Sequence, residues 1–371
     1  MENIKYSNKV MFHFLSRIES IGVASLGKLY ENIKPLSKIL AMEKEEIVKF
    51  SGIDEAKAID IIYCKKNYDK MYESYLSLKD KGISFISIED EEFPEKLKSI
   101  PQAPFYLYVK GRLPDSNKPA VAIVGSRVCS SYGESMTKHI TAQLSKMNID
   151  IISGMASGID RRAHLAALAE GKSTYAVLAG GVDVCYPKQN IDIYAGILDM
   201  GFGIISELPP SAPSLKFNFC MRNRIISGLS DLVLVMEAKE RSGTFITVGH
   251  ALEQGKEVFA LPGRLSDPLS KGCNKLIEGG ASILLSTDNI IESLGLIHDK
   301  KLSLIKKDIN KLANKEKKVY SVIGLEATSV EEILAKTGMK TGECMSILLD
   351  LELKGYISQL FANYYVKNLI K

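Results

Sequence analysis

The sequence contains no tryptophan, only six cysteines and only five histidines among its 371 residues. The cysteines are scattered, and no two of them form a C-x-x-C pair. This spacing argues against a disulfide framework, a zinc ribbon and a thioredoxin-like redox site. The histidines show no H-E-x-x-H spacing, so we expect no metal site.

Long apolar runs are also missing, because none reaches the roughly 20 residues that a membrane-spanning helix needs. The first 20 residues are interrupted by charge and contain no apolar core of a signal peptide. We therefore expect a cytoplasmic protein with no membrane partner. The net charge is only +4. This total neither requires nor excludes a nucleic-acid partner, because a basic groove can be hidden within a balanced sum.

The composition is that of a folded protein, since 46% of the residues are hydrophobic and 25% are charged, which excludes wholesale disorder. At about 150 residues per domain, the length indicates two or three domains. Residue patterns divide the chain into a helical region at 1–76, a connector at 77–118, an alternating strand and helix region at 119–297, and a lysine-rich linker with a small domain at 298–371.

The first region shows helical spacing of apolar residues, with glycines at the breaks between helices. The breaks at Gly22 and Gly52 resemble those of SAM-like or helix–hairpin–helix domains, in which backbone amides can contact phosphate. The same glycines can be ordinary helix C-caps, and the sequence leaves both interpretations open. The proline-punctuated strands of 77–118 predict a connector that packs on the following domain.

The third region alternates apolar, strand-like runs with amphipathic segments. The predicted strands are 121–124, 149–152, 175–178, 203–206, 232–236, 258–261 and 282–285. Near-continuous apolar strands separated by helices predict a doubly wound, mostly parallel sheet. The fold class is therefore α/β, with an extended Rossmann-like domain at the centre of the chain.

The last region opens with eight lysines between residues 300 and 318. One predicted helix ends at Gly338, and a second covers 343–354. The segments 356–360 and 364–366 can pair as a small two-stranded wing. This order resembles a winged helix, a domain that binds DNA in many proteins and only protein partners in others. The sequence leaves the two roles open.

Ligands of open α/β sheets bind beyond the carboxyl ends of the strands. At these ends the sequence places small, polar or basic residues, and glycines there let backbone amides approach a phosphate. The basic residues on this rim are Arg127, Lys188, Lys216, Arg222 and Arg224, with Phe217 and Phe219 among them. A single arginine could serve an ion pair, but five bases interleaved with aromatic residues predict an anion site suited to single-stranded nucleic acid.

Two enzyme classes with related folds are tested by their motifs. A dinucleotide-binding dehydrogenase or P-loop NTPase is rejected, because G-x-G-x-x-G is absent after the first strand of this region and the P-loop-like segment 171–173 precedes a strand instead of following one. A nucleotide phosphoribohydrolase of the lysine-decarboxylase-like type needs an acid shortly after Gly243 and Thr244, where this chain has Thr247. Since that general acid–base carboxylate is missing, a non-enzymatic binding protein is preferred and the hydrolase is the alternative.

Seven motifs follow one another through nearly all of the predicted sheet region. They are VGSR at 124–127, SGMASGID at 153–160, GVD at 181–183 with YP at 186–187, RNRIISGLS at 222–230, SGT at 242–244, ALPG at 260–263 and GCN at 272–274. Together they closely resemble the DNA processing protein A family, DprA, also called Smf. The helical N-terminal region and the winged-helix end are features that members of this family often carry.

The resemblance implies a bacterial protein that binds single-stranded DNA in natural transformation and homologous recombination. It would protect the strand and help the recombinase RecA to load onto it, past single-strand-binding protein. Members of the family are not known as enzymes, act as homodimers through the Rossmann-like domain and need no cofactor. These properties are expectations for the present chain.

The resemblance also implies individual site residues. By position, the DNA-contacting arginine of the family corresponds to Arg127, its other basic contacts to Lys188 and Lys216, and its stacking aromatic residue to Phe219. The family often has a proline after that aromatic residue, whereas two other residues separate it here from Arg222. The loop around Phe219 can therefore be shaped differently from that of the family.

The residues expected to bind DNA are Gly125, Ser126, Arg127, Gly154, Ser157, Gly158, Lys188, Lys216, Phe219, Arg222, Asn223, Arg224, Ser242, Gly243 and Thr244. Structural roles stay open for three of them. Arg222 and Arg224 could pair with Asp231 or cap the rim, and Asn223 could satisfy loop backbone groups.

Phe219 is expected to stack on a base instead of filling the core. In an extended segment, residues two apart face the same way only if the segment is regular. The alternative is therefore that Phe217 stacks while Phe219 packs inward. The rim carboxylates Asp160, Asp183 and Glu207 are expected to orient the arginines and not to bind a metal.

Overall fold

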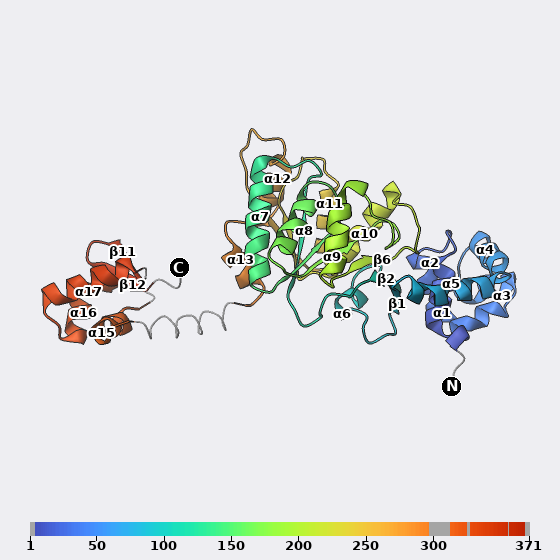
Figure 1. Ribbon diagram of the computed structural model, residues 1–371, viewed down its shortest axis with the longest axis horizontal. Helices are drawn as coiled ribbons and strands as arrows, with labels where there is room; N and C mark the ends of the chain where they lie inside the picture. The colour runs from blue at the N-terminus through green and yellow to red at the C-terminus, as the bar shows by residue number, and fades with distance from the viewer. Residues whose placement is uncertain (1–3, 297–311, 325–326, 355, 368–371) are drawn as a thin grey trace. The chain divides into compact units, whose positions relative to one another are not determined.

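The computed structural model describes residues 4–296, 312–324, 327–354 and 356–367. The chain folds into two compact units, residues 1–289 and 290–371, and each is described by itself (Figure 1). Five of the eight lysines at the start of the last region, Lys300, Lys301, Lys306, Lys307 and Lys311, lie outside the described residues. Within the described ranges, no helix is long and apolar enough to cross a membrane.

The first unit begins with helices. They are η1 (Ile4–Tyr6), α1 (Asn8–Ser16), α2 (Val23–Asn32), η2 (Leu36–Leu40), α3 (Lys44–Ser51), α4 (Glu55–Lys65) and α5 (Tyr68–Asp80), which confirms the expected helical N-terminal region. The two glycines at its breaks differ. Gly52 ends α3 in the left-handed conformation, with φ 68°, as a C-cap does. Gly22 instead precedes α2 with extended backbone, with φ −85° and ψ 177°, so the C-cap interpretation is wrong for Gly22.

A nine-stranded sheet with the order β1-β2-β6-β5-β4-β3-β7-β8-β9 forms the centre of this unit. Its strands are β1 (Ile83–Ser87), β2 (Tyr106–Lys110), β3 (Ala120–Val124), β4 (Asp150–Ser153), β5 (Thr174–Val177), β6 (Ile204–Ser206), β7 (Leu232–Val235), β8 (Glu257–Ala260) and β9 (Ser282–Ile283). Neighbours from β6 to β9 are parallel. The α/β class and the mostly parallel sheet are confirmed, and each of the seven predicted strands ends within two residues of the observed bounds.

The segment 77–118 belongs to the sheet itself. Strands β1 and β2 pair with each other antiparallel, and β2 pairs antiparallel with β6, with Tyr108 opposite Ser206. A short helix, α6 (Glu95–Lys98), lies between the two strands in sequence. The segment therefore extends the sheet by two strands, whereas the sequence predicted that it packs on the sheet domain. The sequence pattern predicts these proline-flanked strands, but it does not predict which strands they pair with.

Helices cover both faces of the parallel part of the sheet. Helices α7 (Ser131–Lys146), α8 (Ile159–Ala169) and α9 (Ile191–Asp199) pack against one another in that order, α10 (Lys216–Gly228) packs against α11 (Thr244–Glu253), and α12 (Lys271–Glu278) packs on β8. From β3, the successive strands β4, β5 and β6 are added toward one edge of the sheet, and β7, β8 and β9 are then added toward the other edge. Right-handed crossovers therefore place the first three helices on one face and the last three on the other. The strand order reverses between β3 and β7, which is the switch point where such sheets bind ligands.

A buried polar contact joins the N-terminal helices to the sheet. The hydroxyl of Tyr108 in β2 lies 2.7 Å from the hydroxyl of Ser16 and 3.0 Å from Nδ1 of His13, both in α1. The His13 ring also meets the Phe85 ring edge-on, with 5.5 Å between ring centres. Burial, aided by the Arg17 cation, lowers the pKa of His13 to about 3. The ring is therefore neutral in the folded protein at neutral pH.

The second unit contains a small three-stranded sheet with the order β10-β12-β11. Its elements are α15 (Asn314–Val322), β10 (Thr328–Ser329), α16 (Val330–Thr337), α17 (Thr341–Leu353), β11 (Ile357–Phe361) and β12 (Tyr364–Lys367), and α13 (Thr287–Ser293) spans the boundary with the first unit. Val319, Ile333 and Leu348 are fully buried in its core. The expected helices and two-stranded wing are confirmed, with β10 as an additional strand. The boundaries of the four predicted regions stay a prediction.

We expect the first unit to lose stability as the pH falls below about 6.5. A histidine with a pKa of about 3 in the folded protein and about 6.5 in the unfolded chain binds its proton only after unfolding over this range. Between these values, each pH unit lowers the free energy of unfolding by about 1.4 kcal/mol for this one group. Urea unfolding at several pH values measures the dependence, which should be shallower in His13→Asn. Equal pH dependence of the two proteins would contradict a buried, neutral His13.

Candidate functional site

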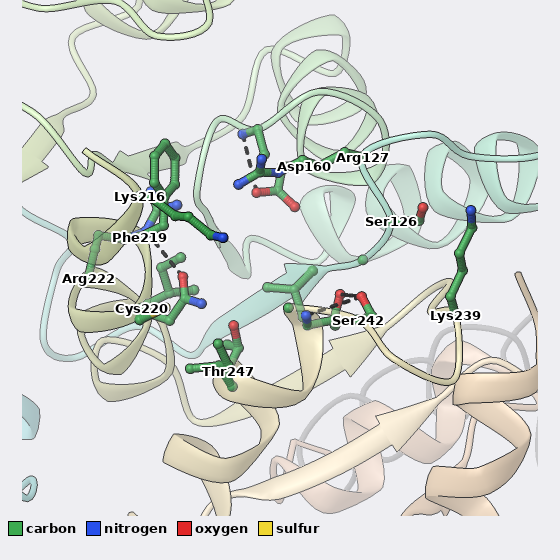
Figure 2. Close-up of a pocket in the computed structure, with 18 of the residues that line it drawn as sticks. Ser126, Arg127, Asp160, Lys216, Phe219, Cys220, Arg222, Lys239, Ser242 and Thr247 are labelled. Carbon is green, nitrogen blue, oxygen red and sulfur yellow. Dashed lines mark hydrogen bonds between the residues drawn. The ribbon is translucent and has the colours of Figure 1, made fainter. Parts of the chain in front are cut away.

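A cavity of about 680 Å³ opens at the switch point of the sheet (Figure 2). Its lining residues are Val124, Gly125, Ser126, Arg127, Val128, Ala156, Asp160, Tyr186, Ser214, Lys216, Phe219, Cys220, Arg222, Asn223, Ile226, Lys239, Arg241, Ser242, Gly243, Thr244, Ile246 and Thr247. Five of these side chains are basic, and one, that of Asp160, is acidic. Across the described part of the chain, no group of three or more histidine, cysteine, aspartate or glutamate side chains is placed to hold a metal ion.

The loop after β3 is held by backbone contacts. The amide of Ser126 donates to the carbonyl of Glu237 at 2.8 Å, and the amide of Ile159 donates to the carbonyl of Ser126 at 3.1 Å. Gly158, with φ +74°, lies so close to this loop that a Cβ there would overlap the Ser126 carbonyl oxygen. These contacts fix the backbone from which the exposed Arg127 side chain extends.

The segment that starts at Lys216 is helix α10 and not extended chain. Residues two apart on a helix are rotated by about 200° from each other, so Phe217 and Phe219 face different ways. Phe217 is 70% exposed and lies outside the cavity lining. Phe219 is half-buried and lines the cavity. Neither ring belongs to the buried core, so the inward packing of Phe219 that the alternative required is not observed.

Two cations and a second aromatic ring surround Phe219. The guanidinium carbon of Arg127 lies 5.1 Å from the centre of the Phe219 ring, and that of Arg222 lies 5.8 Å from it. The ring of Tyr186 lies 5.8 Å away, tilted by 61°. Guanidinium groups at these distances are attracted by the negative face of an aromatic ring. The cavity therefore combines positive charge with aromatic surface in one place.

Arg222 is 7% exposed and holds α10 against the sheet. Its Nη1 donates to the carbonyls of Gly154, at 2.8 Å, and of Val177. Burial lowers the pKa of Arg222 to about 10, although the carboxylate of Asp160 opposes this shift, so the side chain remains a cation at neutral pH. Burial also raises the pKa of Asp160, and the positive charge of Arg222 opposes that shift in turn. The expectation that Asp160 serves an arginine fits this pairing of charges.

Arg224 turns into the protein, where it is 1% exposed and outside the cavity lining. Its Nη2 donates to both carboxylate oxygens of Glu207, at 2.8 and 2.6 Å. The suggestion that Arg224 pairs with Asp231 is wrong, because the carboxylate of Asp231 lies 2.7 Å from Nζ of Lys96 instead. Arg224 therefore has the structural role that the sequence left open.

The carboxylate of Asp183 and the side-chain amide of Asn223, also on the predicted rim, each have a hydrogen-bond partner. Asp183, which was expected to orient an arginine, accepts the backbone amide of Ser211 at 2.7 Å instead. Asn223 lines the cavity, and its Oδ1 accepts a hydrogen bond of 3.3 Å from Nε of Arg222. Asn223 thus contacts a side chain of the site and does not merely satisfy loop backbone.

Five residues of the expected binding set lie outside the cavity lining: Gly154, Ser157, Gly158, Lys188 and Arg224. Gly154 and Gly158 lie beneath the Arg222 side chain and the loop of Arg127. Lys188 is exposed in the short helix η3 (Lys188–Asn190). The next residue, Gln189, donates from Nε2 to the hydroxyl of Ser157 at 2.6 Å. Lys188 therefore lies on the rim, beside the start of α8.

Ser242, Gly243 and Thr244 line the cavity at the start of α11, as the expected set has them. The structure adds Tyr186, Lys239 and Arg241, which that set lacks. Lys239 and Arg241 are exposed and follow closely on the end of β7. The same rule that directed attention to the other strand ends applies to this loop, and it is the signal that could have found both residues.

Comparison with known proteins places the chain among DNA-processing proteins. Residues 84–295 match the family model of DNA recombination-mediator protein A, and residues 307–362 match the DprA winged helix domain. Protein Smf of Escherichia coli is 36% identical over 301 residues, which are 80% of each chain. DNA processing protein DprA of Bacillus subtilis is 40% identical over 228 residues, 61% of this chain and 76% of the relative. The X-ray structure of DprA from Streptococcus pneumoniae has a TM-score of 0.64 and 34% identity, covering 79% of this chain and 98% of that one.

Gly158→Ala is expected to destabilise the first unit by about 1–3 kcal/mol, because a positive φ and the overlap with the Ser126 carbonyl both penalise a side chain. Gly243→Ala is the matched control. Its φ is −60° and nothing lies within 4 Å of a Cβ built there, so a change within about 0.5 kcal/mol is expected. Urea unfolding of both variants makes the comparison. Equal stabilities would show that the loop after β3 is not held as described.

Proposed function

Because the chain belongs to the DNA recombination-mediator protein A family, also named DprA or Smf, we propose that it binds single-stranded DNA in the cavity at the switch point. One observation carries the proposal: five basic side chains and two aromatic rings share a lining with a single buried carboxylate. Basic side chains attract the phosphates of any strand. Aromatic rings stack on bases of any sequence, a combination suited to unpaired strands.

Phe219 favours a single strand over a duplex. Its ring is half-buried and flanked by the guanidinium groups of Arg127 and Arg222. A base has to leave its own stack to reach such a ring, and an unpaired base does so at lower free-energy cost than a paired one. Tyr186, exposed beside Phe219, offers a second surface for a neighbouring base.

Arg127 and Lys216 are the principal phosphate contacts of the proposal. Both are exposed at the cavity, and neither has an ion-pair partner in the part of the chain that the structure describes. Lys188 would extend the contact along the rim beyond Tyr186. Backbone and hydroxyl groups of Gly125, Ser126, Ser157, Ser242, Gly243 and Thr244, with the Asn223 amide, would complete the surface for the strand.

The remaining residues of the expected set position this surface. Arg222 contributes its charge to the cavity and anchors α10. Gly154 and Gly158 let the Arg222 side chain and the loop of Arg127 lie close to the strand ends. Arg224 is left out of the proposed DNA contacts, because its guanidinium is buried against Glu207.

A buried carboxylate favours the binding protein over a nucleotide-hydrolysing enzyme. Rossmann-like domains hold a nucleotide phosphate at the N-terminus of the helix that follows their first strand. At the corresponding start of α7, the carboxylate of Glu237 accepts hydrogen bonds from the hydroxyl and, at 2.9 Å, the amide of Ser130. A negative charge at this position repels a phosphate. The single carboxylate of the cavity lining, Asp160, is buried and accepts a hydrogen bond of 3.3 Å from the amide of Ala156.

We further propose that the bound strand is protected and passed to the recombinase RecA, past single-strand-binding protein, in natural transformation or general recombination. Family membership supports this role. RecA should assemble faster on a strand coated with single-strand-binding protein when the chain is added, and an unchanged rate would count against this role.

A homodimer through the sheet domain is also proposed, on the ground of family membership. Sedimentation at the mass of one chain would argue against it.

Arg127→Ala and Lys216→Ala are each expected to weaken binding to single strands of any sequence. Each should flatten the slope of log affinity against log salt by about 0.7 per lost phosphate contact. The measurement is a titration of single- and double-stranded DNA of equal length across a salt series, with Arg264→Ala, an exposed base outside the lining, as the control. Duplex binding as tight as single-strand binding at every salt concentration would refute the proposal. An unchanged slope in both variants would remove these two residues from the contacts.

Phe219→Ala is expected to lose about 1–3 kcal/mol of binding free energy to single strands, the usual contribution of a stacked base. Its melting temperature should change little, because the Phe219 ring lines a cavity and is not part of the packed core. Replacing a core phenylalanine by alanine would instead cost about 3–5 kcal/mol of folding free energy. Phe217→Ala, which removes a 70% exposed ring outside the lining, is the matched control and should keep both properties. Loss of affinity in Phe217→Ala alone would transfer the stacking role to that residue.

A further inference from the structure

The loop between β7 and α11 carries two basic residues to which the proposed function assigns no role. Lys239 and Arg241 are exposed and line the cavity. Among the described residues, neither has an ion-pair partner. Glu240 stands between them in sequence but lies outside the lining, and its Oε1 is 3.8 Å from Nζ of Lys275. The two positive side chains therefore face the cavity without the intervening negative one.

The start of this loop is tethered to another segment, and a local hydrogen bond lies at its end. At its start, the amide of Ala238 donates to the carbonyl of Leu269 at 2.9 Å, and the amide of Gly272 donates to the carbonyl of Ala238 at 2.8 Å. At its end, the amide of Thr244 donates to the hydroxyl of Ser242 at 3.2 Å. Binding a ligand to Lys239 and Arg241 therefore requires ordering of two side chains and little ordering of backbone, which limits the entropic cost.

The loop lies across the cavity from the aromatic site. Figure 2 shows Lys216 and Phe219 on one side and Lys239 on the other, with Ser242 near Lys239. Exposed apolar surface lines the cavity as well, because Val128 is 74% exposed and Ile246 is 39% exposed. Sugars and base faces of a strand that crosses the cavity can pack on such apolar side chains.

We propose that Lys239 and Arg241 bind phosphates of the strand on the side opposite Phe219, so that a single strand crosses the cavity from Lys216 to the β7–α11 loop. The inference rests on the proposed single-strand binding and adds a path and two contacts to it. In the free protein, these two positive side chains repel the other basic side chains of the cavity lining. A polyanion that spans the cavity is attracted by the basic side chains on both of its sides and offsets this repulsion.

The double variant Lys239→Ala/Arg241→Ala tests the path. Titrated with a single strand longer than the ~16 nucleotides of the largest single-domain sites, it should flatten the slope of log affinity against log salt by about 1.4, which is 0.7 for each of two contacts. Arg264→Ala/Lys271→Ala removes the same charge from exposed positions outside the lining and should leave the slope unchanged. Lys239→Arg/Arg241→Lys keeps both charges and should also retain the slope.

A strand with uncharged methylphosphonate linkages at one end locates the contact. When the uncharged linkages are at the end that reaches the β7–α11 loop, they should weaken the affinity of the wild-type protein. They should cause no further loss of affinity in the double variant, because the linkages and the substitutions remove the same interaction. If the losses from the linkages and from the substitutions add, whichever end of the strand carries the linkages, the proposed path is wrong. An unchanged slope in the double variant, or an equal change in the charge-matched control, would overturn the contacts.

Failure of this inference differs from failure of the proposed function. If the wild-type protein binds and Arg127→Ala flattens the slope while Lys239→Ala/Arg241→Ala does not, only the path is wrong. If the wild-type protein does not bind single strands, the proposed function itself is wrong. Urea unfolding of the double variant shows whether it folds, and Lys239→Gln/Arg241→Gln provides a second pair of neutral side chains for the same titration.

Discussion

The buried guanidinium of Arg222 is the interaction on which the rest of the site depends. A buried cation destabilises a protein unless its donors are satisfied, and this one donates to the carbonyls of Gly154 and Val177 at the ends of β4 and β5. These bonds dock α10 on the carboxyl ends of two neighbouring strands, at carbonyls 68 and 45 residues before Arg222 in the sequence. Lys216 and Phe219 lie six and three residues before Arg222 on the same helix, so they reach the cavity only through this docking.

Much of the fold can be predicted from hydrophobic pattern, because the central parallel strands β3, β4, β5, β6 and β7 are buried along their whole length and appear as apolar runs. Strand pairing is different. β1 and β2 carry ordinary strand signals, yet they join the sheet only through the pairing of β2 with β6, about a hundred residues away in the sequence. For this reason the sequence predicted only a segment packed on the sheet domain and did not predict that it adds two strands to the sheet. The winged-helix order could be predicted because its core is local, with every buried contact drawn from one short segment.

The site was only partly predictable, since sequence does not distinguish a buried base from an exposed one. Arg222 and Arg224 look like surface residues in the RNR motif, but both are buried against different partners. Arg222 bonds the carbonyls of Gly154 and Val177, and Arg224 bonds the carboxylate of Glu207. The alternation of Phe217 and Phe219 suggested extended chain. A helical signal was present, because Phe219, Arg222 and Ile226 follow one another at intervals of three and four residues and all line the cavity.

The position of Glu237 distinguishes this sheet from one with a nucleotide phosphate pocket at the helix after its first parallel strand. The helix N-terminus that would bind a phosphate is already paired with a carboxylate of the protein itself. The exposed basic side chains of the cavity come from other elements, Arg127 from the loop after β3, Lys216 from α10, and Lys239 and Arg241 from the loop between β7 and α11. Contacts spread in this way cannot concentrate on one pyrophosphate. They match the ligand that we propose, a single strand whose phosphate charges repeat along its length.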